Sequence, residues 1–228
     1  MVDGKMNNIL YEDNHLLVVE KPVNMLVQAD DTNDLDLLTN LKKYVKEKYN
    51  KPGEAYLGLV HRLDRPVGGV MVFARTSKAA SRLSNIIRTH EFEKTYLAIV
   101  CGKVPEEGTF EDYLLKLEKE NKTIVDKSGK YSSLSFKLLS YKDGLSLVKI
   151  KLDTGRSHQI RVQFSSRSFP LWGDQKYNSN AKVGDQIALW SYEIKFKHPT
   201  REEIMDFKSS PPSNYPWNLF GDVINGKI

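Results

Sequence analysis

The sequence predicts an α+β fold, with a mainly antiparallel β-sheet core flanked by a few helices. Apolar and polar residues alternate through 134–138, 148–152 and 190–196, as they do in strands that bury one face. Asp143 and Gly144 lie between the first two segments and favour a hairpin turn. Half-buried strands joined by hairpins are typical of antiparallel sheets. We therefore expect one compact domain, in which two lobes can share the sheet.

The first half of the chain supplies the helices and further strands. Apolar residues recur every three or four positions from Leu35 to Tyr49, which predicts a helix. Ser77 can cap a second helix that runs to about His90. The segment 105–131 mixes charges of both signs and predicts loops. Short apolar runs predict strands at 15–22, 68–76 and 94–104.

Composition limits the classes of function. The 228 residues include 34 Lys and Arg against 29 Asp and Glu, so the net charge of +5 permits a polyanionic partner without demanding one. The single cysteine, Cys101, excludes an internal disulfide, and the five histidines are scattered, so we expect no metal site. No phosphate-binding glycine motif is present, and we expect no cofactor, including nucleotide cofactors. Lacking a long apolar segment, the chain is expected to be a soluble, cytoplasmic protein without membrane contact.

One carboxylate stands in a cationic setting. In "LVHRLDRPVGGV", Asp64 lies between Arg62 and Arg65. Cationic neighbours favour the ionised form of a carboxylate, which is a ready nucleophile. The alternative is an ion pair within the loop itself, and residue types alone favour this second interpretation.

A second group of basic residues lies in "DTGRSHQIRVQF", 153–164. Ser157 is a plausible N-cap for a short helix, on which His158 and Arg161 share a face. With Arg156, they can gather at the helix start and hold a phosphate or a carboxylate. An amphipathic helix with solvated basic residues explains the same pattern equally well.

An aromatic residue, Tyr96, lies in the middle of the strand segment "EKTYLAIV". A tyrosine in such a place is most often a core or cross-strand residue. The sharper interpretation is a ring that stacks on a nucleobase.

Taken in order, these segments resemble the RluA-type RNA pseudouridine synthases. "YEDNHLLVVEKPVNMLVQ" is similar to that family's opening strand and lysine-proline turn, and "HRLDRPVGGVMVFART" to its catalytic segment. "EKTYLAIV" resembles its lysine-x-tyrosine strand and "TGRSHQIRVQF" its GRxHQIR helix, while "FPLWGDQKY" and "ALWSYEIKFKHP" match more loosely. The resemblance implies the pseudouridine synthase catalytic fold in a single domain, 1–228, with a core at about 9–207. No separate N-terminal RNA-binding domain is expected.

The resemblance also implies an activity, the isomerisation of uridine to pseudouridine in transfer or ribosomal RNA by a monomer without a cofactor. Asp64 would be the nucleophile, attacking either the sugar carbon or the ring. Tyr96 would stack on the flipped base and help to remove the C5 proton. Arg161 would pair with Asp64, and Arg62 would displace or replace the flipped nucleotide. The resemblance implies, more weakly, that four further residues contact the RNA backbone or support the site: Arg65, Lys94, Arg156 and His158.

The chain departs from the family pattern in the "RPVGG" stretch and at four positions, none of which is implied to be catalytic. These departures bear on the RNA target rather than on the reaction. We expect target-specific contacts from 105–131 and from the basic helix at 42–48. The four positions are Gln163, Phe169, Trp190 and Ser191.

Two other functions remain open at this point. A non-catalytic RNA-binding or chaperone protein of the same fold would not depend on Asp64. A carboxylate-dependent hydrolase of nucleosides or glycosides would share the sugar chemistry, but it usually needs a second carboxylate, and none stands out near Asp64.

Overall fold

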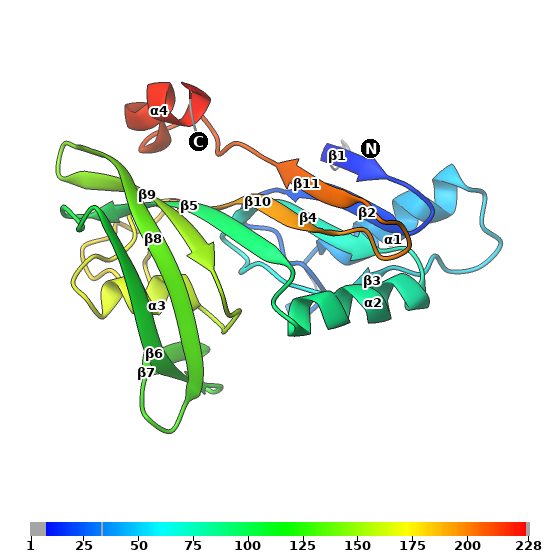
Figure 1. The fold of residues 1–228 in the computed structure, drawn as a ribbon, viewed down its shortest axis with the longest axis horizontal. Helices are drawn as coiled ribbons and strands as arrows, with labels where there is room; N and C mark the ends of the chain where they lie inside the picture. Colours follow the sequence, from blue (N-terminus) through cyan, green and yellow to red (C-terminus); the bar gives the residue numbers. More distant parts are fainter. Residues whose placement is uncertain (1–7, 33, 227–228) are drawn as a thin grey trace. The chain divides into compact units, whose positions relative to one another are not determined.

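The structure is a computed structural model that describes residues 8–32 and 34–226. The chain divides into two compact units. Unit 1 comprises Met1–Phe92 and Glu193–Ser209, and unit 2 comprises Glu93–Tyr192 and Ser210–Ile228. The described residues form strands and helices of both units (Figure 1), which confirms the predicted α+β class.

Unit 1 is built on a sheet whose pairs β1/β2, β2/β4, β3/β4 and β10/β11 are all antiparallel. Its helices are α1 (Leu37–Lys48) and α2 (Ser77–Arg88). The strand order is β1 (Asn8–Glu12), β2 (Leu16–Lys21), β4 (Gly68–Ala74) and β10 (Leu189–Lys197), with β3 (Gly58–Leu59) on β4 and β11 (Ile204–Lys208) on β10. Only the part of β10 from Glu193 onward belongs to unit 1. The strands predicted at 15–22, 68–76 and 190–196 are therefore confirmed.

Helix α2 begins one residue earlier than the sequence suggested. Thr76 has an extended backbone, and its hydroxyl accepts a hydrogen bond from the Ala79 amide at 3.1 Å. Ser77 is the first helical residue, so the prediction that Ser77 caps this helix was wrong. Both residues are good N-caps, and the extended backbone at Thr76 decides between them.

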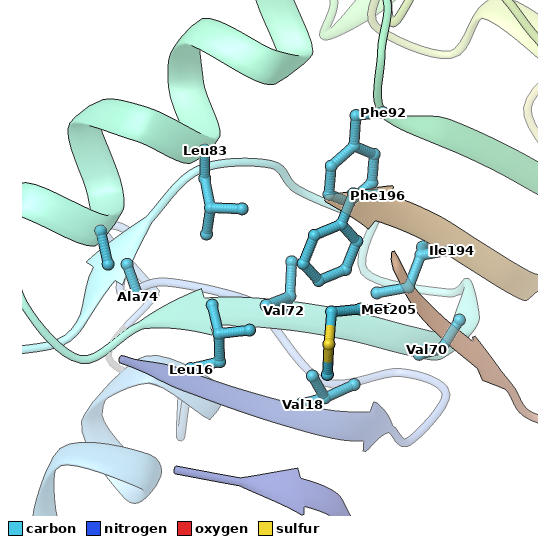
Figure 2. Close-up of a cluster of buried hydrophobic side chains, with 11 residues drawn as sticks. Leu16, Val18, Val70, Val72, Ala74, Leu83, Phe92, Ile194, Phe196 and Met205 are labelled. Carbon is cyan, nitrogen blue, oxygen red and sulfur yellow. The ribbon is translucent and has the colours of Figure 1, made fainter. Parts of the chain in front are cut away.

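One core cluster of unit 1 lies between α2 and one face of the sheet. Figure 2 shows Leu83 pointing from the helix toward the strands and the rings of Phe92 and Phe196 lying against each other. These two rings are stacked, with centroids 4.9 Å apart. The strands contribute Leu16, Val18, Val70, Val72, Ala74, Ile194 and Met205.

Helix α1 docks onto β1 through a buried carboxylate. Glu12 accepts hydrogen bonds from Tyr44 and Tyr49 at 2.9 and 2.8 Å and forms an ion pair with Lys48 at 2.7 Å. Lys46 pairs with Glu54 at 2.7 Å. Carboxylates thus engage much of the positive charge of the basic helix predicted at 42–48.

Unit 2 is built on antiparallel pairs β5/β9, β8/β9, β6/β8 and β6/β7. Asp143 and Gly144 form the turn between β8 and β9, with φ of 52° and 77°, as the two-residue hairpin predicted. The strand order is β5 (Glu93–Cys101), β9 (Leu145–Leu152), β8 (Lys130–Lys142), β6 (Glu107–Leu117) and β7 (Lys122–Val125).

The loop predicted at 105–131 was wrong, since β6 and β7 lie there. Phe110 and Leu114 are the buried positions of β6, and the partly buried residue between them on the same face is Asp112. Because Asp112 is an acidic residue at an inward-facing position, it interrupts the apolar alternation from which a strand would be predicted. Asp112 is accommodated because Arg167 forms an ion pair with it at 2.9 Å.

Helix α3 (Gln159–Ser165) packs on this sheet through Phe164, whose ring lies 4.9 Å from that of Phe110 and 5.4 Å from that of Phe136. His158 occupies the N-cap position with φ of 52° and makes no side-chain cap bond. The predicted N-cap at Ser157 was therefore wrong. The last described elements are the 3-10 helix η1 (Trp217–Phe220) and α4 (Gly221–Gly226).

Among the described helices, none combines the length and apolar character needed to cross a bilayer.

Candidate active site

Asp64 lies on a turn of unit 1 that is fixed at both ends. The Val67 amide donates to the Asp64 carbonyl at 3.0 Å, which closes the turn just before β4. On the other side, Nε2 of His61 accepts a hydrogen bond from the Val72 amide at 3.1 Å. The Asp64 side chain is half-buried. The carboxylate is therefore carried by a short segment anchored on β4.

A buried lysine supports the same turn. The Lys21 side chain ends β2, is fully buried, and donates to the carbonyl oxygens of Pro22, Arg65 and Val67 at 2.9, 3.0 and 2.7 Å. Burial lowers the pKa of Lys21 to about 7, and the negative charge of Asp64 opposes this shift. Lys21 thus holds the backbone on which Asp64 sits. Lys21 is the lysine of the lysine-proline turn that the family resemblance had marked in the sequence.

The two arginines that flank Asp64 in the sequence behave differently. Arg65 forms an ion pair with Asp34 at 2.7 Å, with both side chains about half exposed. Such an exposed pair contributes little to stability. Arg62 is exposed. This ion pair is not the one predicted as the alternative role of Asp64, because the carboxylate that Arg65 contacts is that of Asp34.

In unit 2, Tyr96 lies on the face of the sheet that α3 covers. It pairs directly with Ile150 on β9, which pairs in turn with Phe136 on β8. Directly paired residues point to the same face, and Phe136 contacts Phe164 of α3. Tyr96 is 7% exposed, so it is buried as a core residue would be.

Lys94 shares this face because it precedes Tyr96 by two residues on β5. Its Nζ atom lies 3.4 Å from the position that a Cβ on Gly155 would take, so this glycine gives the ammonium room. Burial lowers the pKa of Lys94, and Asp153 opposes the shift. Within 8–32 and 34–226, no carboxylate comes within 4.0 Å of the Lys94 ammonium.

Arg161 is held by a buried carboxylate that the sequence analysis did not single out. Its Nε donates to Oδ2 of Asp174 at 2.9 Å, and its Nη2 donates to Oδ1 at 2.7 Å. The guanidinium also lies over the ring of Tyr177, 5.2 Å from its centroid. The segment "FPLWGDQKY" carried both residues, but nothing in its spacing connects them with Arg161.

His158 and Arg161 both contact Tyr177, but His158 is the N-cap of α3 and not a residue of the helix, so the prediction that the two share a helix face was wrong. Nδ1 of His158 lies 2.7 Å from the Tyr177 hydroxyl, which accepts a hydrogen bond from the Thr123 amide at 2.8 Å. Burial raises the pKa of Tyr177, so its phenol stays protonated. Arg156 instead is exposed and donates from Nε to the Tyr131 carbonyl at 2.9 Å.

Gln163, one of the departures from the family pattern, is fully buried. Its Nε2 donates to the Phe110 carbonyl at 3.2 Å and to the Asp112 carboxylate at 2.7 Å. Gln163 therefore serves the packing of α3 on β6. In the described part of the chain, no three His, Cys, Asp or Glu side chains gather as metal ligands would.

Comparisons with known proteins give the family. The model of the family "RNA pseudouridylate synthase" matches residues 15–166. An uncharacterized RNA pseudouridine synthase of Aquifex aeolicus is 32% identical, with 91% of this chain and 70% of that protein covered. Ribosomal large subunit pseudouridine synthase D of Pseudomonas aeruginosa is 30% identical, with 92% and 70% covered. Human RNA pseudouridylate synthase domain containing 4 has a TM-score of 0.78 at 22% identity, covering 95% of this chain and 92% of that one.

The fold is thus that of the pseudouridylate synthase domains, as the structural likeness shows. The chain belongs to the RNA pseudouridylate synthase family, in its RluA-type branch. It is accordingly an isomerase that acts on RNA.

Proposed function

We propose that the chain converts specific uridines of ribosomal RNA to pseudouridine, with Asp64 as the nucleophile. The observation that carries this assignment is the position of Asp64 in the "HRLD" segment, on a turn that His61 and Lys21 fix at both sides. A nucleophile gains from a rigid support because the reacting atoms must meet in one geometry. Relatives named as ribosomal large subunit pseudouridine synthases support ribosomal RNA as the substrate class.

The reaction needs no co-reactant. The bond between C1′ and N1 breaks, the uracil turns, and a bond forms between C1′ and C5, while the C5 proton leaves and N1 takes up a proton. The Asp64 carboxylate attacks either C1′ or the pyrimidine ring and is released at the end. Because the departing uracil is also the incoming nucleophile, atoms and electrons balance without a cofactor.

Tyr96 and Arg161 complete the proposed chemistry. The Tyr96 ring stacks on the flipped uracil, which offsets part of the few kcal/mol that base extrusion costs. Arg161 keeps the nucleophilic carboxylate ionised, since a cation favours the charged form. Arg62, which is exposed, is proposed to take the place of the flipped nucleotide.

The RNA backbone is assigned to the remaining basic groups. Lys94 is the strongest of these, because its ammonium is desolvated and no carboxylate pairs with it in the described residues. A phosphodiester would supply the missing negative charge. We assign the same general role to Arg65, Arg156 and His158, and we propose a monomer that works in the cytoplasm.

Tritium release from RNA labelled at C5 of uridine tests the nucleophile. We expect release by the wild type and none by Asp64→Ala, which should still bind RNA. Asp34→Ala is the matched control, since it removes a carboxylate from the same unit and is expected to keep its activity. Release by Asp64→Ala would refute the assignment. Binding without release by the wild type would favour the non-catalytic, chaperone alternative.

A further inference from the structure

The carboxylate of Asp174 is buried inside unit 2, and both of its oxygens accept hydrogen bonds there. Its side chain is 0% exposed and that of Arg161 is 7% exposed. Both Asp174 oxygens accept hydrogen bonds from the Arg161 guanidinium, Oδ2 from Nε and Oδ1 from Nη2. Oδ1 also accepts a hydrogen bond from the Lys176 amide at 3.1 Å. A side chain so enclosed cannot touch an RNA substrate. Whatever Asp174 does for the reaction, it does through Arg161.

The backbone around Asp174 is fixed independently of Arg161. Gly173 has φ of 71°, and a Cβ there would lie 2.6 Å from the Gln186 carbonyl oxygen, so only glycine fits this turn. The Asp174 carbonyl then accepts from the amides of Tyr177 and Asn178 at 3.2 and 2.8 Å. The carboxylate is therefore presented by a rigid turn rather than by a mobile loop.

This arrangement determines the orientation of the guanidinium. A two-point pair between arginine and a carboxylate fixes the plane of the group as well as its position. The ring of Tyr177 lies against the guanidinium, 5.2 Å from centroid to Cζ. The pair with Asp174 uses Nε and one N–H of Nη2, and by fixing the plane of the guanidinium it also fixes the direction of the group's remaining donors.

We infer that Asp174 is a positioning residue that holds the Arg161 guanidinium in its working orientation. The inference rests on the proposed function, in which Arg161 keeps the nucleophilic carboxylate ionised. Without Asp174, Arg161 would retain its charge but lose the fixed direction of its donors. The loss would therefore appear in the rate of the chemical step and not in the affinity for RNA.

Asp174→Asn tests this inference by single-turnover tritium release. The substitution keeps the size of the side chain and removes the charge. We expect the rate to fall about 100-fold, the effect of a small misplacement of a catalytic group, with RNA affinity unchanged. The matched control is Asp112→Asn, which removes the ion-pair partner of Arg167, just beyond the same helix. This control is expected to keep its rate.

A double-mutant cycle with Arg161→Lys separates positioning from a general effect on folding. If Asp174 acts through Arg161, Asp174→Asn has little further effect once Arg161 is lysine. Equal losses in both backgrounds, or a wild-type rate for Asp174→Asn, would overturn the inference while leaving the proposed function intact. A wild type that releases no tritium would overturn the proposed function and the inference together. If Asp174→Asn does not fold, Asp174→Glu, which keeps the charge and displaces it, is expected to lower the rate in the same background-dependent way.

Discussion

Lys21 joins two segments that are far apart in the sequence. Its ammonium donates to the Arg65 and Val67 carbonyls, in the turn that follows Asp64, and its side chain is fully buried. Three carbonyl oxygens satisfy its donors but supply no full negative charge, so desolvation dominates and the pKa falls to about 7. Lys21 therefore stabilises the loop geometry, but burial of its charged form costs free energy, and this cost depends on pH.

Lys21→Met exposes this dependence. In the folded protein Lys21 loses its proton near pH 7, whereas in the unfolded chain it keeps the proton up to its ordinary pKa of 10.5. Between these values the unfolded state binds more protons, so the free energy of unfolding rises with pH. We expect the stability of the wild type relative to Lys21→Met to increase from about pH 7 to about pH 10 and to be lost as pH falls through 7. Urea denaturation across this range measures it, and a constant difference would contradict the prediction.

At the scale of elements, the helices start where a side chain can satisfy a free amide. Thr76 caps α2 and Asp36 caps α1, through the amides of Ala79 and Thr39 at 3.1 and 2.9 Å. These bonds are local, so the sequence predicted both helices within two residues of their true bounds. Strand β6 was missed because inward-facing Asp112 depends on Arg167, and that pairing is not local.

Removal of the cap in Thr76→Ala is expected to lower the free energy of unfolding by about 1 kcal/mol. Ser81→Ala is the control, because Ser81 is an exposed residue on the same helix and its loss should change stability by less than about 0.5 kcal/mol. Chemical denaturation compares the two variants. Equal effects would show that helix propensity, and not the cap, accounts for the change.

At the scale of the whole molecule, the net charge of +5 suits a polyanionic substrate. Much of the surface charge is already engaged, since Lys43 pairs with Glu47 and Arg65 with Asp34. The net charge counted from the sequence therefore overstates the number of cationic side chains that are available to bind RNA. Lys94 differs because it is partly buried, and desolvation lowers its pKa by more than the nearby Asp153 raises it.

The salt dependence of RNA binding tests this distinction, with Asp64→Ala as the background so that no turnover occurs. Each phosphate contact contributes about 0.7 to the slope of log affinity against log salt for a single strand. We expect Lys94→Met to reduce the slope by about 0.7, and Lys43→Met to leave it unchanged. The same slope for both variants would remove Lys94 from the RNA interface.

The sequence by itself determined the α+β class, most of the strands and helices, the hairpin at Asp143 and Gly144, and the family. These follow from periodicity, turn chemistry and motif order, which are properties of neighbouring residues. Only the tertiary structure decided that Lys21 supports the turn of Asp64 and that Asp174 and Tyr177 hold Arg161. The physical reason is that a buried charge must find its partners in space. The chain can bring those partners from any distance along the sequence, and no local pattern marks them.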